Sequence, residues 1–232
     1  ALPIWPIFAT RATIDLAELI LRDAAKIQRY DNERWNRKRK KQRLQPVEVL
    51  FDEEDVDRVM SLMQPVDYNT PVDIIEGVQA VFHLAGHLLG STSIELRVKE
   101  PDAAERRVVF SGDLGPHDSP ILQDSVPFEK ADLVFLESTY GNRLHRPLDE
   151  TVKEFEEIVK TVVARGGKML VPTFAVGRAQ LMLFLLARMF RRGDVPKFPV
   201  YLDSPMAVRA TEIFVRYQDL MDEEVQEMTS EY

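Results

Sequence analysis

Three residues that could bind a metal ion or transfer a proton each follow an apolar, strand-like segment of the sequence. His87 lies in the Gly-rich turn AGHLLG, Asp113 lies in the turn SGDLG, and Glu137 directly follows LVFL. An imidazole nitrogen and a carboxylate oxygen are zinc ligands, and a carboxylate can also bridge two metal ions in a hydrolase. A further carboxylate can orient a histidine or transfer a proton. Strand ends carry reactive groups in α/β proteins, so the three residues are candidates for one site.

Each candidate also has a structural interpretation. A histidine in a Gly-rich turn, such as His87, more often forms a structural hydrogen bond than a metal bond. Asp113 could close an Asx-turn, and Glu137 could cap the loop that follows it. His83, at the end of the preceding strand, is expected to be structural. Taken one at a time, these residues leave the catalytic and the structural interpretations open.

A fourth segment, MLVPTFAVGRAQ, passes from a strand into a helix. Thr173 and Gly177 precede that helix, and Arg178 begins it. Free backbone N–H groups at a helix start, together with a guanidinium group, form an anion site suited to phosphate. The segment lacks the GK[ST] spacing of a nucleotide-triphosphate loop. A little further on, Ser204-Pro205 has the composition of a helix cap and first turn.

The supply of metal ligands in the chain is small. Among 232 residues there are four histidines and no cysteine, which excludes a cysteine nucleophile and a thiolate zinc site. Nothing indicates an oxidising compartment, so a cytoplasmic location is the expectation. No apolar run approaches the roughly 18 residues of a membrane span, and no membrane partner is expected.

The charge of the chain is uneven. Residues 34–43 read RWNRKRKKQR, with seven basic residues and no acidic one, and the rest of the chain then has 23 basic against 38 acidic residues. A basic segment on an acidic body is typical of local contact with a polyanion, and Arg37, Arg39 and Lys41 are candidate contacts with RNA. A solvated helix end is the alternative explanation of such a run.

The hydrophobic periodicity predicts the elements that position these residues. It predicts helices over residues 11–30, 52–63, 148–164, 178–190 and 204–217. It predicts strands over residues 6–9, 78–82, 94–98, 108–110, 133–136, 168–171 and 200–202. Strands that come first and then alternate with helices indicate an α/β fold.

Together and in this order, the polar turns resemble the β-CASP branch of the metallo-β-lactamase superfamily. The resemblance is to its RNA-processing nucleases related to the polyadenylation-cleavage factor. It is carried by FHLAGHLLGSTSIEL, VVFSGDLGPHDSPIL, LVFLESTYGNRLH, GGKMLVPTFAVGRAQ and VYLDSPMA, and PIFATRATIDLAELILRDAAKIQ extends it toward the N-terminus. Single pieces such as GDLG are widespread, whereas five in series are specific.

The resemblance implies roles for individual residues. His87 matches a zinc ligand of the family, and Asp113 matches an aspartate that bridges two zinc ions. Glu137 matches the acidic residue that opens the β-CASP signature and supports a catalytic histidine. Arg178, Thr173 and Ser204 lie in segments that line the substrate cleft. The implied cofactor is therefore a pair of zinc ions, and the implied substrate is RNA.

One family motif is missing from the chain. The HxHxDH motif that supplies most zinc ligands is absent, and His87 with Asp113 falls short of the three ligands of a catalytic zinc site. We therefore expect an internal fragment of a longer protein, which by itself has an incomplete metal site and does not hydrolyse RNA.

These expectations combine into one hypothesis. The fold is α/β: a partial αββα metallo-β-lactamase sandwich over residues 1–192, followed by the start of an α/β β-CASP cap over residues 193–232. The intact protein is a zinc-dependent ribonuclease that acts as a homodimer or within a nuclease complex. The alternative is a non-catalytic homologue that binds RNA or serves as a scaffold in a complex. A hydrolase of small thioesters or lactones is disfavoured, because such family members lack the cap.

Overall fold

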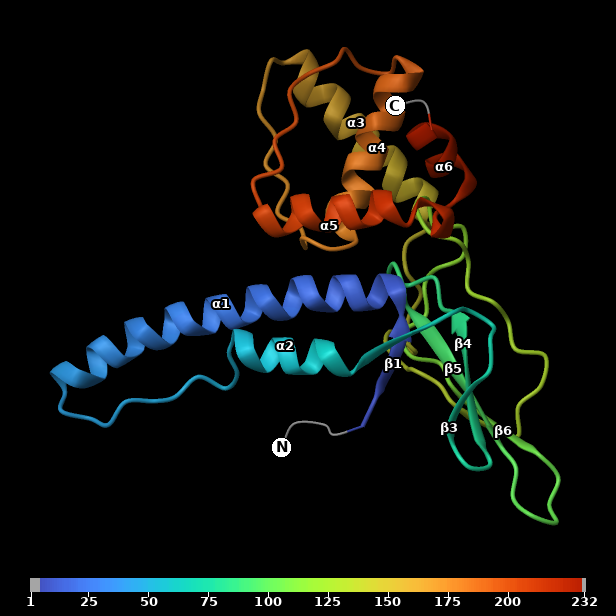
Figure 1. Ribbon diagram of the computed structural model, residues 1–232. Coiled ribbons are helices and arrows are strands. Elements are labelled where there is room, and N and C mark those ends of the chain that lie inside the picture. The colour runs from blue at the N-terminus through green and yellow to red at the C-terminus, as the bar shows by residue number, and fades with distance from the viewer. Residues whose placement is uncertain (1–4, 231–232) are drawn as a thin grey trace.

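The computed structural model of the chain describes residues 5–230, which form two lobes (Figure 1). A sheet lobe contains all the strands, and a helical lobe contains the helices from α3 onward. The strands are β1 (Ile7–Thr10), β2 (Met63–Val66), β3 (Val72–Ile75), β4 (Val78–Leu84), β5 (Thr92–Val98), β6 (Arg106–Phe110) and β7 (Leu133–Phe135). The helices are α1 (Arg11–Lys41), α2 (Glu53–Leu62), α3 (Leu148–Ala164), α4 (Arg178–Arg192), α5 (Pro205–Arg216), the short 3-10 helix η1 (Gln218–Leu220) and α6 (Glu223–Ser230).

The strands form two sheets that pack against each other. One sheet has the order β3-β4-β5-β6-β7, antiparallel except for the parallel pair β6–β7, and the other is the parallel pair β1–β2. Alternate residues of β4 point inward, so that Ala80 and Phe82 form a core cluster with Val66 of β2, against which Phe8 of β1 packs. The predicted α/β class is confirmed.

A second core joins the two lobes. Leu16 and Leu19 of α1 are buried in one cluster with Phe184 of α4 and Phe214 of α5. Leu89, from the turn after β4, belongs to the same cluster and is 2% exposed. The turn that carries His87 is therefore held in the apolar contact between the lobes.

Helix α1 is longer than the periodicity predicts, because the basic segment continues it to Lys41. Thr10 caps its start by accepting a hydrogen bond from the Thr13 N–H group. Arginine and lysine are good helix formers, and cations near a helix C-terminus interact favourably with its dipole. The helix ends at Lys41 with Gln42 as its C-cap; Arg43, which has a φ of 58°, and Pro46 follow.

Two predicted strands, residues 168–171 and 200–202, are wrong. Both segments are irregular, and their apolar side chains are exposed: Leu170 by 92% and Tyr201 by 86%. A strand is stable only when its backbone pairs with a neighbour, and the described part of the larger sheet ends at β7. The apolar composition of these segments is typical of strands, but such a pattern does not supply a pairing partner.

The remaining helix predictions are confirmed to within two residues. α3 spans residues 148–164 as predicted, and Ser204 caps α5. Gly193, with a φ of 73°, ends α4 at the expected domain division. One apolar cluster includes both Met189 and Val195, so packing is continuous across that point. No helix among the described residues is long and apolar enough to cross a membrane.

Candidate active site

The turn that carries His87 is fixed by its own hydrogen bonds. The Ala85 N–H group donates to the Ser91 carbonyl at 3.2 Å and closes the turn. The Ser91 hydroxyl accepts hydrogen bonds from the N–H groups of His87 and Leu88, each at 3.1 Å. Gly90 has a φ of 87°, a conformation that glycine adopts without strain. The imidazole of His87 is thus exposed on a rigid turn and is free to contact a ligand.

The turn that carries Asp113 lies directly against this first turn. The Gly115 N–H group donates to the Ala85 carbonyl at 2.8 Å. A Cβ atom on Gly115 would lie 2.0 Å from the Gly86 carbonyl oxygen and 2.7 Å from the His87 nitrogen, so only glycine allows this approach. Asp113 itself is exposed. The close glycine contact brings the backbones on either side of His87 and Asp113 together.

Glu137 joins the same cluster from the end of β7. Its Oε1 accepts a hydrogen bond from the Leu114 N–H group at 2.6 Å, and its own N–H group donates to the Ser111 hydroxyl at 3.0 Å. The Leu114 hydrogen bond lowers the pKa of Glu137, with smaller contributions from a hydrogen bond to Thr139 and the charge of His87. The Glu137 carboxylate is therefore ionised and oriented beside the turns of His87 and Asp113.

Helix α4 starts against this cluster. Gly177, with a φ of 81°, turns the chain into α4, and a Cβ atom there would lie 2.9 Å from Cδ1 of Leu88. Gln180 holds this start: its Oε1 accepts from the Gly177 N–H group at 2.7 Å, and its Nε2 donates to the Thr211 hydroxyl at 2.9 Å. Arg178 is exposed at the first position of α4. The predicted anion site therefore lies next to the turn of His87, but its expected free N–H groups are wrong: Gly177 donates to Gln180, and the N–H groups of residues 178 and 179 donate to carbonyls of residues 176 and 174.

Thr173 and Ser204 occupy different surroundings. Thr173 is exposed in the irregular segment before α4. The Ser204 hydroxyl accepts a hydrogen bond from the Ala207 N–H group at 3.2 Å and so caps α5. Ser204 thus has a structural task in its helix, whatever further contact its hydroxyl makes.

The predicted contacts in the basic segment lie elsewhere. Arg37 and Lys41 are exposed on the distal half of α1, which extends away from the sheet lobe (Figure 1). Arg39 is half-buried, and its Nε donates to the Gln45 carbonyl at 2.7 Å. The turns of His87, Asp113 and Glu137 form what we call the loop cluster. The structure therefore does not bring these three basic residues together with the loop cluster.

The loop cluster meets the requirement of a metal site only in part. His87 and Asp113 offer the nitrogen and oxygen donors that zinc accepts. The described residues contain no group of three or more His, Cys, Asp or Glu side chains that could hold a metal ion. The donors fit zinc in kind, but their number does not reach the three that a catalytic site uses, so no reaction step through a metal follows from this geometry.

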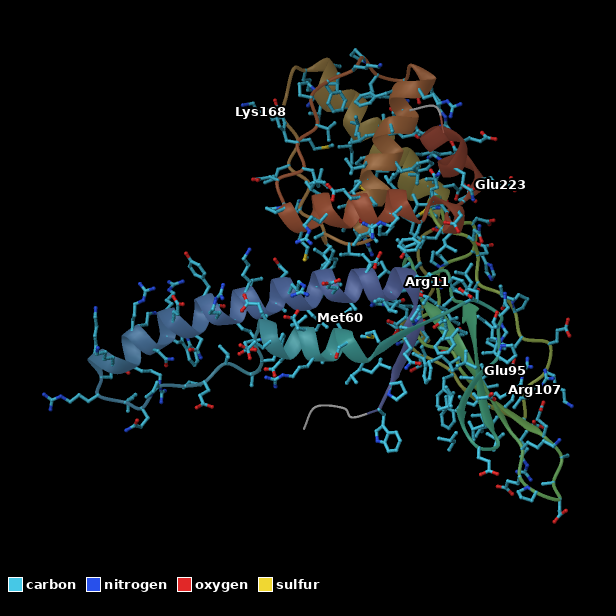
Figure 2. The ribbon with its side chains drawn as sticks, in the orientation of Figure 1. Arg11, Met60, Glu95, Arg107, Lys168 and Glu223 are labelled. Atoms are coloured by element: carbon cyan, nitrogen blue, oxygen red, sulfur yellow. The ribbon has the colours of Figure 1, made fainter. Side chains whose placement is uncertain are left out.

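His83 is structural, as predicted. Its Nε2 lies 3.2 Å from Glu95 Oε2, and its Nδ1 lies 2.8 Å from Asn69 Oδ1. Glu95 is buried in β5 and also accepts a hydrogen bond from Arg97 Nε at 2.6 Å, with Arg107 nearby; Figure 2 labels Glu95 and Arg107 on the sheet lobe. This network stabilises the sheet beneath the loop cluster.

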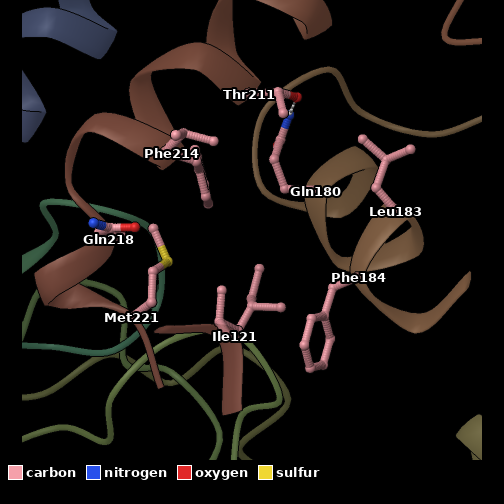
Figure 3. A pocket seen from close by; sticks show the side chains of 10 residues that line it. Ile121, Gln180, Leu183, Phe184, Thr211, Phe214, Gln218 and Met221 are labelled. Atoms are coloured by element: carbon pink, nitrogen blue, oxygen red, sulfur yellow. Dashed lines mark hydrogen bonds between the residues drawn. The ribbon is translucent and has the colours of Figure 1, made fainter. Parts of the chain in front are cut away.

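A small apolar pocket lies in the helical lobe (Figure 3). Its volume is about 120 Å³, and it lies between α4 and α5. Phe184, Phe214 and Met221 line it, and its polar lining is uncharged: Gln180 and Thr211, which are hydrogen-bonded to each other, and Gln218. Such a lining offers no charge for a phosphate group, so the pocket does not compete with the loop cluster as a site for phosphodiester chemistry.

Sequence reasoning missed the groups that hold the cluster together. The Ser91 and Ser111 hydroxyls bind backbone groups of the loops, and Gly115 sets the distance between them. Thr10 and Thr13 each donate a hydroxyl hydrogen bond of 2.8 Å to the Gly90 carbonyl, which ties the start of α1 to the His87 turn. The only available signal was the recurrence of Ser and Gly in GST and SGDLG.

Known proteins resemble both the chain as a whole and its last part. Residues 179–232 match the Beta-Casp domain family. Ribonuclease TTHA0252 of Thermus thermophilus is 38% identical over 221 residues, which are 95% of this chain and 45% of the relative. The cleavage and polyadenylation specificity factor subunit 3-I of Arabidopsis thaliana is 28% identical over 91% of the chain and 28% of its own length.

A third relative is also similar along nearly the whole chain. Transcription termination factor FttA of Methanocaldococcus jannaschii is 29% identical over 96% of the chain and 32% of its own length. The chain thus spans less than half the length of each of these three relatives. The domain match, the similarity to all three along nearly the whole chain, and the mixed α/β fold agree, and the chain belongs to the β-CASP branch of the metallo-β-lactamase superfamily.

Proposed function

We propose that this chain is part of a metal-dependent ribonuclease that hydrolyses RNA phosphodiester bonds at the loop cluster of His87, Asp113 and Glu137. The observation that carries the proposal is the contact between the two turns: Gly115 allows the backbones beside His87 and Asp113 to meet, and Glu137 is anchored to the same turn. The relatives support it, since the Thermus protein is named a ribonuclease and the Arabidopsis protein a cleavage factor subunit.

Each residue has a proposed task. His87 and Asp113 would supply two of the ligands of a metal centre, for which we propose two zinc ions; the chemistry that such ions supply is activation of water and stabilisation of charge on a phosphate. Glu137, already ionised and held by the Leu114 N–H group, positions a proton-transferring imidazole. Arg178, at the exposed start of α4, neutralises a substrate phosphate through its guanidinium group. Thr173, exposed before α4, and Ser204, at the start of α5, are further proposed substrate contacts.

We also propose the division at residue 193, a cytoplasmic location and assembly as a homodimer or within a nuclease complex. The naming of the Arabidopsis relative as a subunit supports assembly in a complex. Residues 1–192 would then carry the loop cluster, and residues 193–232 would begin the cap.

The test is cleavage of a labelled RNA by the full-length protein, together with its metal content. We expect bound zinc and endonucleolytic or exonucleolytic products, and we expect His87→Ala to lower both zinc content and turnover. A wild-type protein that binds zinc and leaves RNA intact would contradict the proposal.

The alternative is a non-catalytic homologue that binds RNA or acts as a scaffold. It is favoured by one observation: the described residues contain no complete group of metal ligands. The discriminating measurement is the same assay, because a scaffold would bind RNA without cleaving it and would contain no zinc. The retention of His87, Asp113 and Glu137 in contacting loops favours the enzyme.

A further inference from the structure

The distal half of α1 is a separate surface from the loop cluster. Helix α2 packs along the first part of α1, and the last ion pair between them joins Arg29 and Glu53 at 3.1 Å. Beyond that pair, α1 continues into the region that Figure 1 shows extending away from both lobes. We call residues 30–46 the basic arm.

The inner face of the basic arm holds the chain that follows it. Asn36 Nδ2 donates to the Val47 carbonyl at 2.9 Å, and Asn36 Oδ1 accepts from the Val47 N–H group at 2.9 Å. Asn32 Nδ2 donates to the same carbonyl at 2.8 Å, and Arg39 Nε donates to the Gln45 carbonyl at 2.7 Å. Residues 32, 36 and 39 share one helix face, so this face is occupied by hydrogen bonds to the chain that follows the helix.

The outer face of the basic arm carries cations and an aromatic ring. Tyr30, Arg34, Arg37, Lys38 and Lys41 recur at i, i+4, i+7, i+8 and i+11, which places them on one helix face, and all five are exposed. Arg37 alone among them has a salt-bridge partner in residues 5–230, the Glu33 carboxylate at 3.6 Å, and such an exposed pair is weak and screened by salt.

Aromatic rings and a groove adjoin these cations. Tyr30 is 76% exposed, and Trp35, three residues before Lys38, is 63% exposed. On the flank of the arm, a groove of about 640 Å³ is lined by three cationic residues, one anionic residue, two asparagines and two apolar residues: Arg37, Lys40, Arg43, Glu33, Asn32, Asn36, Leu44 and Pro46. Cations beside exposed rings and apolar walls suit a ligand that has both phosphates and flat bases.

We propose that the basic arm binds single-stranded RNA, with phosphates along Arg34, Lys38 and Lys41 and a base stacked on Tyr30. Stacking on aromatic side chains combined with a positively charged track is the way proteins bind single strands without sequence preference. A membrane-binding helix would need a continuous apolar face instead, and the face opposite the cations is occupied by hydrogen bonds to residues 45 and 47.

The residues of this RNA-binding surface differ in one respect from the RNA contacts expected from the sequence alone. Arg39 lies on the inner face and holds Gln45, whereas Arg34 and Lys38 lie on the outer face beside Lys41. The RNA-binding surface is therefore one face of the helix and not the whole basic segment.

The arm also has a defined spacing from the loop cluster. Thr13 is tied to the Gly90 carbonyl, beside the His87 turn, and Tyr30 and Lys41 lie 17 and 28 residues further along the same helix. At a rise of about 1.5 Å per residue, this places the outer face about 25–42 Å from that anchor. A strand with about 3.4 Å per stacked nucleotide needs roughly 8–12 nucleotides to reach both surfaces. This step rests on the proposed function of the loop cluster.

The binding test uses a labelled, unstructured 30-nucleotide RNA and the triple variant Arg34→Glu/Lys38→Glu/Lys41→Glu. We expect affinity to fall more than about 30-fold and the salt slope of log K to shrink by about 2, since each lost phosphate contact contributes about 0.7. The matched control, Lys99→Glu/Lys130→Glu/Lys153→Glu, makes the same change of charge at exposed lysines outside the arm. Equal losses in both variants, or no loss in the first, would overturn the proposal.

Two single substitutions separate the faces of the arm. Tyr30→Ala removes the stacking ring and should weaken binding about tenfold. Arg39→Lys keeps the charge and loses the Nε hydrogen bond, and it should change RNA affinity less than twofold. The reverse order of effects would overturn the assignment of the outer face. Circular dichroism of each variant confirms that the helix is retained, and tighter binding to anionic phosphatidylserine vesicles than to RNA would also count against the proposal.

Cleavage by the full-length protein distinguishes this inference from the proposed function. The triple variant should raise KM for the 30-nucleotide RNA at least tenfold and leave kcat unchanged, while cleavage of a 5-nucleotide RNA stays the same. Equal effects on both lengths would contradict a distant binding surface. A wild-type protein that cleaves neither RNA would refute the nuclease proposal. The binding assay alone would then decide whether the basic arm binds RNA.

Discussion

The loop cluster and the basic arm are built in opposite ways. In the loop cluster, the backbone sets the geometry: Gly115 touches the carbonyl of Gly86, and Ser91 and Ser111 bind loop N–H groups. In the basic arm, a single helix sets only the spacing of long, exposed side chains. The first arrangement holds the loops in a fixed geometry, as bond-breaking chemistry requires. The second supplies charge and stacking surface, as capture of a flexible strand requires.

This contrast predicts where a substitution acts. Adding a single carbon atom at a contact point should destabilise the loop cluster, because its loops are in backbone contact. The arm should tolerate changes of shape and respond to changes of charge.

Gly115→Ala should destabilise the fold by about 3 kcal/mol, because its Cβ atom would lie 2.0 Å from the Gly86 carbonyl oxygen and the two loops would have to separate. Urea unfolding measures the change. The control is Gly167→Ala, where the nearest atom is a side-chain methyl group of Val162 at 3.3 Å, which needs to shift only slightly, so the loss should stay below about 1 kcal/mol. Equal losses in the two variants would show that the loops are not held in contact.

Glu95→Gln should destabilise the sheet under the loop cluster by about 2 kcal/mol, because it removes the carboxylate from the network of His83, Arg97 and Arg107. Unfolding of the variant by urea at neutral pH measures the change. Arg58→Gln is a useful comparison, because it removes an exposed ion pair with Glu54 and should cost less than about 0.5 kcal/mol.

The same network predicts a pH dependence. Burial opposes the charge of Glu95, but the hydrogen bond and charge of Arg97, the charge of Arg107 and the bond to His83 outweigh it, so the pKa of Glu95 lies below its usual 4.5. A carboxyl group with a lowered pKa stabilises the fold fully above the unfolded-state pKa, and this stabilisation is lost as pH falls through the folded-state pKa. The free energy of unfolding should therefore decline below about pH 4.5, and less steeply in Glu95→Gln than in the wild type. Parallel declines would contradict the role of the network.

Thr10→Ala should cost about 1 kcal/mol, because Thr10 both caps α1 and donates to the Gly90 carbonyl at 2.8 Å. This substitution acts at the joint between the basic arm and the loop cluster. Hydrogen exchange should show faster opening of the Gly90 turn together with the first turn of α1. Faster exchange in α1 alone would mean that the helix start and the turn are not coupled.

Asn36→Ala should cost less than about 1 kcal/mol, because it removes two exposed hydrogen bonds to Val47 from the inner face of the arm. Limited proteolysis should show faster cutting within residues 44–50, and RNA affinity should remain within twofold. A large loss of RNA affinity would show that the inner face contributes to binding.

Different parts of the molecule were predictable from the sequence to different degrees. Helix α3 and the cap at Ser204 were predicted closely because periodicity and capping are local properties. The two wrong strands, at residues 168–171 and 200–202, are apolar as strands are, but strand formation depends on a partner elsewhere in the chain. The extension of α1 to Lys41 was underpredicted because the apolar stripe stops before the basic segment, where helix propensity alone continues the helix.

The candidate site shows the same limit. His87, Asp113 and Glu137 could be singled out from residue type and position, and the structure places their loops together. The bonds of Ser91 and Ser111, and the contact at Gly115, depend on loops that lie far apart in the sequence. No local pattern encodes which serine hydroxyl meets which N–H group. For the same reason, the charge run could not show that Arg39 turns inward while Arg34 and Lys38 turn outward.

The most direct test of the loop cluster as the site of RNA hydrolysis is Asp113→Asn in the full-length protein, with kcat and RNA affinity measured on one labelled substrate. The substitution keeps the size of an exposed side chain and removes its charge. The account predicts that kcat falls more than about 100-fold while RNA affinity, supported by the basic arm, stays within about threefold. An unchanged kcat would contradict the assignment of this cluster as the site of cleavage.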